Sequence, residues 1–170
     1  MAKRISLRQF QESLVSRLAE ARSGEVPRGL LGIQAGEEFW LTDLADAGEI
    51  VPTPAIAPVP LAKRWLRGLA NIRGSLCLVI DFAAFHGGSA TTPTGDTRLL
   101  LPNARYGSNC ALLVSRALGL RNPEAFEEHE TGADERAWVS GELVDPQGKR
   151  WKRLSFGALL AHPQFLDVAG

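Results

Sequence analysis

The segment spanning residues 65–85, WLRGLANIRGSLCLVIDFAAF, constrains the fold of this chain more than any other stretch of its sequence. We predict a strand over residues 68–72, a turn, and a second strand over residues 76–80. The apolar run LCLVI does not alternate with polar residues, which is typical of a strand covered on both faces. Asp81 then stands in the position of an N-cap, so a short helical turn is expected to begin there.

The turn between these two strands is polar and reads Asn71-Ile72-Arg73-Gly74. The guanidinium of Arg73 is permanently charged and offers up to five N–H donors in a planar fork, which suits a carboxylate or the carbonyl groups at the end of a partner helix. The amide of Asn71 both donates and accepts hydrogen bonds. Two interpretations are open: Arg73 binds a partner, or it braces its own loop by bonding backbone carbonyls.

The spacing of these residues resembles the signature of CheW-like domains, the coupling proteins of bacterial chemosensory arrays. The pattern R-G-x-x-N-[IL]-R-G occurs at residues 67–74, and the downstream [VI]-[IL]-D occurs at residues 79–81. Weaker similarity extends through residues 39–60 and 112–120. The resemblance implies a mainly β fold of two SH3-like, five-stranded β-barrels that pack around a shared apolar interface, with an N-terminal amphipathic helix.

The same resemblance implies a non-enzymatic adaptor. Such a protein would couple the cytoplasmic tip of a methyl-accepting chemoreceptor to the regulatory domain of a CheA-type histidine kinase, without a cofactor or a metal ion. The residues that match contact positions of the family are Glu49, Ile50, Asn71, Arg73 and Gly74. The chain would then be cytoplasmic and associated with membrane-bound receptor arrays, without inserting into the membrane itself.

Two features refine this resemblance. Residues 40–52, WLTDLADAGEIVP, together with a long N-terminal helix, are similar to the branch of the family that controls type IV pili and twitching motility. The second half of the family pattern usually has an acid after its apolar-Val pair, but this chain has Ser115 there. Contacts that this strand makes in relatives are therefore not expected to carry over.

The chain divides into an N-terminal helical extension, residues 1–26, and a CheW-like domain, residues 27–166. Residues 6–21 start with the capping-box pattern S-x-x-Q and carry apolar residues at helical spacing. This helix packs on its own domain or docks a partner. Within the domain, we place the first barrel at residues 48–103 and build the second from both flanking regions.

The remaining elements are predicted from turn signals and periodicity. Ile56 and Val59 should anchor the proline-rich stretch PTPAIAPVP, which is extended. We also expect a hairpin over 29–41, a mobile surface loop over 86–97, strands over 97–101 and 110–114, a solvated acidic stretch over 124–135, a hairpin of 138–144 with 149–154, and a closing helix over 155–161.

Bulk composition favours a folded protein without a strong electrostatic preference. The 170 residues are 45% hydrophobic, and the 19 basic and 19 acidic residues give a net charge of zero. A zero net charge argues against a general nucleic-acid or membrane-surface binder, because such proteins carry a basic excess. The sequence has no run long enough to span a bilayer and no signal-peptide pattern, and its cysteines suit a reducing compartment.

Catalytic chemistry has little support in the sequence. The histidines lack metal-ligand spacing, and the serines lack a nucleophile-elbow setting. A hydrolase with Cys110 as its nucleophile is the weakest alternative, since no base can be assigned to it, while Cys77 lies in an apolar strand and should be inert. An acidic group on a turn, expected to be solvated, comprises Asp43, Asp46 and Glu49.

The main alternative to an adaptor is a small β-barrel nucleic-acid-binding module. The strand at residues 149–153, Lys-Arg-Trp-Lys-Arg, interleaves cations with an aromatic ring, a combination that stacks bases and contacts phosphates. The competing structural interpretation is an edge strand that its charges protect from aggregation.

Overall fold

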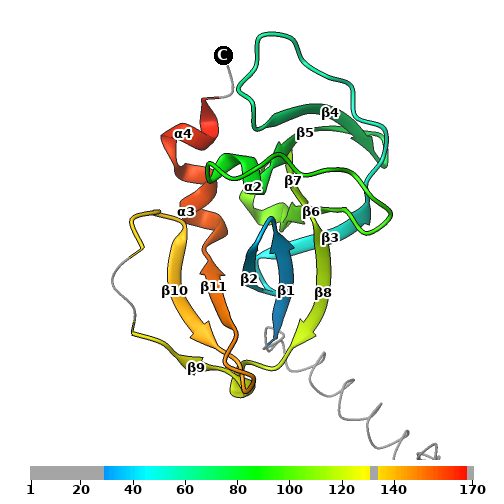
Figure 1. Ribbon diagram of the computed structural model, residues 1–170. Helices are drawn as coiled ribbons and strands as arrows, with labels where there is room; N and C mark the ends of the chain where they lie inside the picture. The colour runs from blue at the N-terminus through cyan, green and yellow to red at the C-terminus, as the bar shows by residue number, and fades with distance from the viewer. Residues whose placement is uncertain (1–28, 131–133, 168–170) are drawn as a thin grey trace, which may run out of the picture.

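The computed structural model describes residues 29–130 and 134–167, which form two β-sheets with short helices beside them (Figure 1). The N-terminal helix predicted over residues 6–21 lies outside the described residues. Sheet A has the strand order β8-β1-β2-β11-β10-β9. Its strands are β1 (Leu30–Ala35), β2 (Glu38–Asp43), β8 (Arg116–Arg121), β9 (Glu127–Glu128), β10 (Val139–Val144) and β11 (Arg150–Leu154).

Sheet B has the strand order β3-β6-β7-β5-β4. Its strands are β3 (Ala47–Pro52), β4 (Leu66–Ile72), β5 (Ser75–Asp81), β6 (Arg98–Pro102) and β7 (Cys110–Val114). The helices are α2 (Phe82–Phe85), α3 (Phe156–Ala161), α4 (Pro163–Leu166) and the 3-10 turns η1 (Ala104–Tyr106) and η2 (Pro123–Ala125). Figure 1 shows α2 between the two sheets and α3 and α4 alongside it.

The mainly β, two-sheet architecture expected from the sequence is confirmed, with two corrections. β7 belongs to sheet B, because it pairs parallel with β5 and antiparallel with β6. Sheet B, which corresponds to the first predicted barrel, therefore extends beyond the predicted limit of residue 103. Sheet A gains a sixth strand from β9, which has two residues and pairs with β10.

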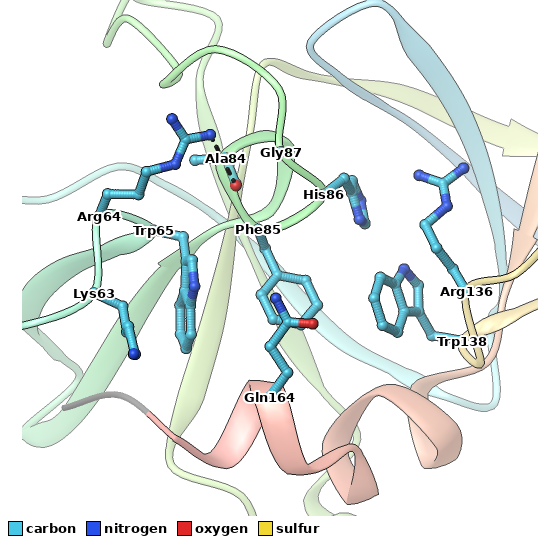
Figure 2. Close-up of a pocket in the computed structure, with 10 residues that line it drawn as sticks. All are labelled: Lys63, Arg64, Trp65, Ala84, Phe85, His86, Gly87, Arg136, Trp138 and Gln164. Carbon is cyan, nitrogen blue, oxygen red and sulfur yellow. Dashed lines mark hydrogen bonds between the residues drawn. The ribbon is translucent and has the colours of Figure 1, made fainter. Parts of the chain in front are cut away.

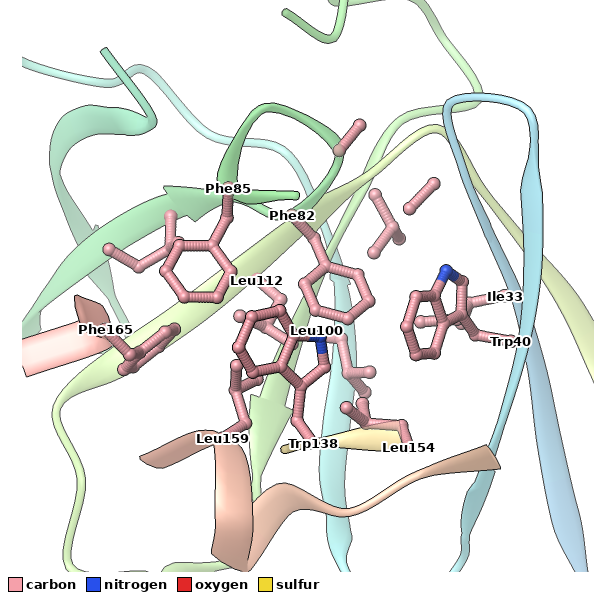
Figure 3. Packing of buried hydrophobic residues seen from close by; sticks show 14 of the residues in the cluster. Ile33, Trp40, Phe82, Phe85, Leu100, Leu112, Trp138, Leu154, Leu159 and Phe165 are labelled. Atoms are coloured by element: carbon pink, nitrogen blue, oxygen red, sulfur yellow. The ribbon is translucent and has the colours of Figure 1, made fainter. Parts of the chain in front are cut away.

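The main hydrophobic core lies between the two sheets and is rich in aromatic side chains (Figure 3). Phe82 contacts Trp40 with ring centroids 4.9 Å apart, and Phe85 contacts Trp138 at the same distance. A second cluster, which includes Val79 and Leu99, lies within sheet B. A third, which includes Trp151, lies within sheet A. Each sheet therefore buries side chains on both of its faces, as the LCLVI run indicated for β5.

The burial of β5 is less uniform than its sequence suggested. Leu76 is 61% exposed and Leu78 is half-buried, whereas Val79 and Ile80 are fully buried. Successive side chains of a strand point to opposite faces, and the start of β5 projects beyond the core as part of a hairpin with β4. The two leucines were predicted to be buried, and for Leu76 this prediction is wrong.

The connection from β3 to β4 follows an extended and largely exposed path, as its prolines indicated. Ala57 forms a bridge to Leu69 of β4, and Ile56 packs against the cluster in sheet B. Val59 was expected to be an anchor, but it is exposed. Leu61 is more exposed still and has a positive φ of 57°. A left-handed backbone is rare for a leucine, which makes this position strained.

The predicted hairpin of β10 and β11 is confirmed, and its turn closes with Gly148 at a φ of 81°. The charged strand β11 is central in sheet A, between β2 and β10, so its interpretation as an edge strand is wrong. Ser155 caps α3 by accepting a hydrogen bond from the backbone N–H of Ala158, and α4 begins at Pro163. None of the helices in the described ranges is long and apolar enough to cross a membrane.

Candidate partner-binding surface at the β4–β5 hairpin

The turn of the β4–β5 hairpin has a defined geometry. Arg73 and Gly74 have φ angles of 52° and 82°, and Ile72 pairs with Ser75 across them. Two consecutive positive φ angles are the mark of a type I′ turn, whose twist matches that of the flanking strands. Asn71 stabilises the turn by accepting a hydrogen bond of 2.8 Å from the N–H of Gly74 at its Oδ1. The tip is therefore rigid, and the Arg73 side chain projects from it.

Arg73 forms an ion pair with Glu49 of β3. β3 and β4 are the two outer strands of sheet B, so this pair joins opposite edges of the sheet. The Arg73 side chain is nevertheless 75% exposed, and exposed ion pairs contribute about 0–1 kcal/mol to stability. Arg73 therefore does brace the fold, through a carboxylate on another strand, but the contribution to stability is small. Most of its N–H donors still face solvent.

We use the name hairpin surface for Glu49, Asn71, Arg73, Gly74 and Leu76. Leu76 pairs with Asn71 across the hairpin and adds an exposed apolar group beside the polar ones. It was missed because its sequence context is apolar. Ile50, also singled out from the sequence, is half-buried and packs against the main core rather than joining this surface. Its side chain holds β3, and therefore Glu49, in position.

Other residues of the same signature work inside the fold. Asp81 is fully buried and accepts hydrogen bonds at 2.7 Å from the N–H of Thr91, at 2.8 Å from the Thr91 hydroxyl and at 3.2 Å from the N–H of Ala84. It also pairs with Arg67 at 3.2 Å. The predicted N-cap of α2 is thus confirmed. The loop over 86–97, expected to be a mobile surface loop, is attached to the core through buried Thr91.

Gly68 explains a further part of the signature. Its φ is 138°, and a Cβ placed there would lie 2.0 Å from the carbonyl oxygen of Ala57. A glycine is needed because the proline-rich connection crosses β4 at this point in backbone contact. The start of the signature therefore fixes the path of the chain, and its middle forms the exposed tip.

The acidic residues Asp43, Asp46 and Glu49 were expected to be solvated, but each of them pairs with a group of the fold. Asp43 pairs with Arg153 at 2.9 Å, and Glu49 pairs with Arg73. Asp46 accepts a hydrogen bond of 2.8 Å from the hydroxyl of Tyr106 and also pairs with Arg105. The Asp43 pair lies within sheet A and the Glu49 pair within sheet B, while Asp46 attaches the connection between β2 and β3 to η1.

The residues considered for catalysis lie in unsuitable surroundings. Cys77 and Cys110 are buried free thiols, and burial raises the pKa of both, which disfavours the reactive thiolate. Cys110, the residue considered as a nucleophile, is as deeply buried as Cys77. The part of the chain that the structure describes brings together no group of three or more His, Cys, Asp or Glu side chains suited to a metal ion.

His86 lies between two indole rings instead of in a catalytic arrangement. Its ring stacks on Trp40 at 4.9 Å and on Trp138 at 5.6 Å, with interplanar angles of 18° and 21°. Burial, together with the nearby guanidinium of Arg136, lowers the pKa of His86 to about 4. The imidazole is therefore neutral near pH 7 and serves as an aromatic packing group.

The basic-aromatic strand does not offer a nucleic-acid surface. Trp151 is 1% exposed, and its indole N–H donates to Asp145 at 3.0 Å, so its ring is inaccessible to a base. The ammonium of Lys149 lies 3.9 Å from the ring centroid of Phe39. Lys152 and Arg153 pair with the carboxylates of Asp134 and Asp43. The strand lacks the accessible stacking platform that single-stranded nucleic acid requires.

The cations around this strand belong to an ion-pair network between β2, β11 and the segment before β10. Arg136 donates to both carboxylate oxygens of Glu38 at 2.9 Å and pairs with Asp134 at the same distance. Burial alone would raise the pKa of Glu38, but Arg136 holds it below its usual range. The hydrogen bond from Arg136 likewise lowers the pKa of Asp134. The network therefore consists of ionised groups at neutral pH.

The sequence profile of the CheW-like domain matches residues 29–164, which is most of the chain. The chain belongs to the CheW-like family. It is 27% identical over 143 residues to Protein PilI from Pseudomonas aeruginosa, covering 82% of this chain and 79% of that protein. It is also 32% identical over 71 residues to Chemotaxis protein CheW from Treponema pallidum, covering 41% and 42% of the two chains.

A solved CheW-like structure has the same fold. The scaffolding protein TtCheW from Thermoanaerobacter tengcongensis superposes with a TM-score of 0.64 at 20% sequence identity, over 76% of this chain and 90% of that one. This likeness confirms the paired SH3-like barrels expected for a CheW-like domain. Ser115, which replaces the usual acid, lies at the junction of β7 and β8, where its hydroxyl accepts a hydrogen bond from the N–H of Gly36 at 3.1 Å.

Proposed function

We propose that this CheW-like protein is a non-enzymatic adaptor that couples a methyl-accepting chemoreceptor to a CheA-type histidine kinase. The observation that carries the proposal is the hairpin surface, on which a rigid type I′ turn presents the Arg73 guanidinium to solvent. Family membership supports the adaptor role, and the similarity to Protein PilI over 82% of the chain supports a system that controls type IV pili and twitching motility. The protein would join membrane-bound arrays through its receptor.

The mechanism is positional. An adaptor that binds two partners at once fixes their relative geometry, so a conformational bias in the receptor changes the free energy of the kinase states that the adaptor contacts. A hairpin held by an internal hydrogen bond at Asn71 and by its pairing with Glu49 loses little conformational freedom on binding. Individual contacts of modest area suffice, because an array provides many of them at once.

A calorimetric titration of the protein against the regulatory domain of a CheA-type kinase tests this proposal. We expect saturable binding in a one-to-one ratio and a loss of about tenfold in affinity for Arg73→Ala, because an arginine fork that meets a carboxylate is a typical binding hot spot. The melting temperature should change little, since the Arg73 ion pair is exposed. A titration against the receptor tip then shows which partner the hairpin contacts.

Arg150→Ala is the matched control, because Arg150 is also an exposed arginine paired with a glutamate, on sheet A. It should bind with wild-type affinity. Binding of neither the kinase domain nor the receptor tip by the wild-type protein would refute the adaptor role. A large fall in the melting temperature of Arg73→Ala would show that Arg73 is mainly a structural brace.

A further inference from the structure

A pocket opens at the opposite end of β5 from the hairpin surface (Figure 2). It has a volume of about 460 Å³ and lies between α2, the residues that precede β4, Trp138 and α4. β5 has seven residues and α2 follows it directly, so the pocket and the hairpin tip are about 20 Å apart. A molecule bound in the pocket would therefore leave the hairpin surface free.

The lining of the pocket is cationic and contains no carboxylate. Lys63, Arg64 and Arg136 all contribute to it. Arg136 is neutralised by the carboxylates of Glu38 and Asp134, which lie outside the lining. Within the described ranges no acidic side chain lies within 4.0 Å of Lys63 or Arg64. The guanidinium of Arg64 donates instead to the carbonyl oxygen of Gly88 at 2.8 Å. The pocket therefore favours an anionic group.

The walls of the pocket are aromatic and carry polar atoms without partners. Figure 2 shows Trp65 and Arg64 on one side, Trp138 and His86 on the other, and Phe85 between them. Among the described residues, neither the indole N–H of Trp138 nor the ring nitrogens of His86 have a hydrogen-bond partner, although all are buried. These atoms are enclosed by the surrounding rings, so the pocket offers a ligand the aromatic side chains and the cations.

Two exposed leucines flank the pocket in sequence. Leu61, which is 91% exposed and has the strained positive φ, lies two residues before Lys63. Leu166, which is 65% exposed, lies two residues after Gln164, another residue of the lining. At Leu61 a large exposed apolar side chain is held in a strained backbone, and this combination indicates a contact surface.

From these observations we infer that the pocket is a second docking surface, for an acidic segment of a partner protein that carries an apolar side chain beside a carboxylate. The carboxylate lies against Lys63 and Arg64. The apolar side chain covers Trp65 and Leu61. This surface is separate from the hairpin surface, so the protein can hold this partner together with the one at the hairpin.

Nitrogen-15 NMR of the indole N–H groups tests the proposal directly, because the chain has four tryptophans. The probe is a synthetic helical peptide of about 14 residues with glutamate and leucine at helical spacing. The resonances of Trp65 and Trp138 should shift saturably. The resonance of Trp151, which is hydrogen-bonded to Asp145 in sheet A, should stay in place. A peptide with lysine in place of every glutamate is the matched control and should not bind.

Charge reversal locates the contact. Lys63→Glu should weaken binding of the acidic peptide by about fivefold or more, whereas Arg150→Glu on sheet A should leave it unchanged. Absence of shifts at millimolar peptide, or equal shifts with the lysine peptide, would overturn the proposal. Removal of residues 2–28 from the free protein should leave Trp65 and Trp138 unmoved. Shifts there would show that the N-terminal segment occupies the pocket, which would also overturn it.

Discussion

At the residue scale, one short signature contains two kinds of residue. Arg67, Gly68 and Asp81 act within the fold, since Asp81 is fully buried and Gly68 touches the backbone of Ala57. Arg73, by contrast, is mostly exposed and pairs with the carboxylate of Glu49 on another strand. A substitution in the first group should therefore change stability, and one in the second group should change binding.

Asp81→Asn should lower the free energy of unfolding by about 3 kcal/mol. The amide cannot accept from Thr91 and Ala84 as strongly as a carboxylate does, and it leaves Arg67 without its counter-charge. Urea denaturation of the purified variant measures the change. Asp96→Asn is the control, because the Asp96 carboxylate is exposed and lies 3.9 Å from Arg116, and it should cost less than about 0.5 kcal/mol. Equal costs would refute the buried role of Asp81.

The sequence predicted the local chemistry of this signature well and its long-range partners poorly. The turn at Arg73 and Gly74 and the cap at Asp81 depend on neighbouring residues, and both follow from local rules. The pairing of Arg73 with Glu49, and the burial of Trp151, depend on which strands meet in space. Single-sequence patterns contain no such information, so a charged strand with a tryptophan appeared accessible although its ring is buried.

At the element scale, β5 connects both candidate surfaces. It starts at the hairpin tip, passes between the main core and the cluster inside sheet B, and ends at the N-cap of α2. Its two ends therefore have different environments. The apolar run in its sequence predicted that β5 would be buried on both faces. It did not predict at which residue the burial ends.

Substitutions at two positions of β5 test how burial differs along the strand. Val79→Asp should abolish cooperative folding, because it places a charge without a partner at a fully buried position. Leu76→Asp should fold with a melting temperature within a few degrees of the wild type, because the side chain at this position reaches solvent. Circular dichroism during a thermal scan distinguishes the two. A folded Val79→Asp protein would show that this face of β5 is not buried.

At the scale of the whole molecule, the two sheets are held together by an aromatic interface around His86. The imidazole is stacked between Trp40 of sheet A and Trp138, and it packs on Phe82 of α2 at 4.1 Å. Nothing in the sequence near His86 signalled this role, since the residue opens a glycine-rich loop and its aromatic neighbours come from distant segments. The interface should therefore respond to the protonation of a single side chain.

Stability should fall as the pH decreases from about 6.5 towards 4. The pKa of His86 is about 4 in the folded protein but near 6.5 when unfolded, so the unfolded state binds the proton first and gains free energy from it. Between pH 7.5 and pH 5 this loss is about 2 kcal/mol. Urea denaturation at the two pH values measures it, and His86→Phe should remove this part of the decrease.

His129→Gln is the control for this experiment, because His129 is only half-buried and lies outside the aromatic interface. It should keep the wild-type pH dependence. The carboxylates of Glu38 and Asp134 have lowered pKa values, so their stabilisation is lost only at more acidic pH. An unchanged pH dependence in His86→Phe would show that protonation of His86 does not cause the loss of stability.

The interleaving of the two sheets has a consequence for how the protein is made. Sheet B comes from one continuous stretch, whereas sheet A needs β1 and β2 from before it and β11 from after it. Trp40 of β2 pairs with Lys152, more than a hundred residues later. During synthesis on the ribosome, the β1–β2 hairpin therefore keeps an unpaired edge on β2 while sheet B folds. The nascent chain is exposed to aggregation at β2 until its last strand is released.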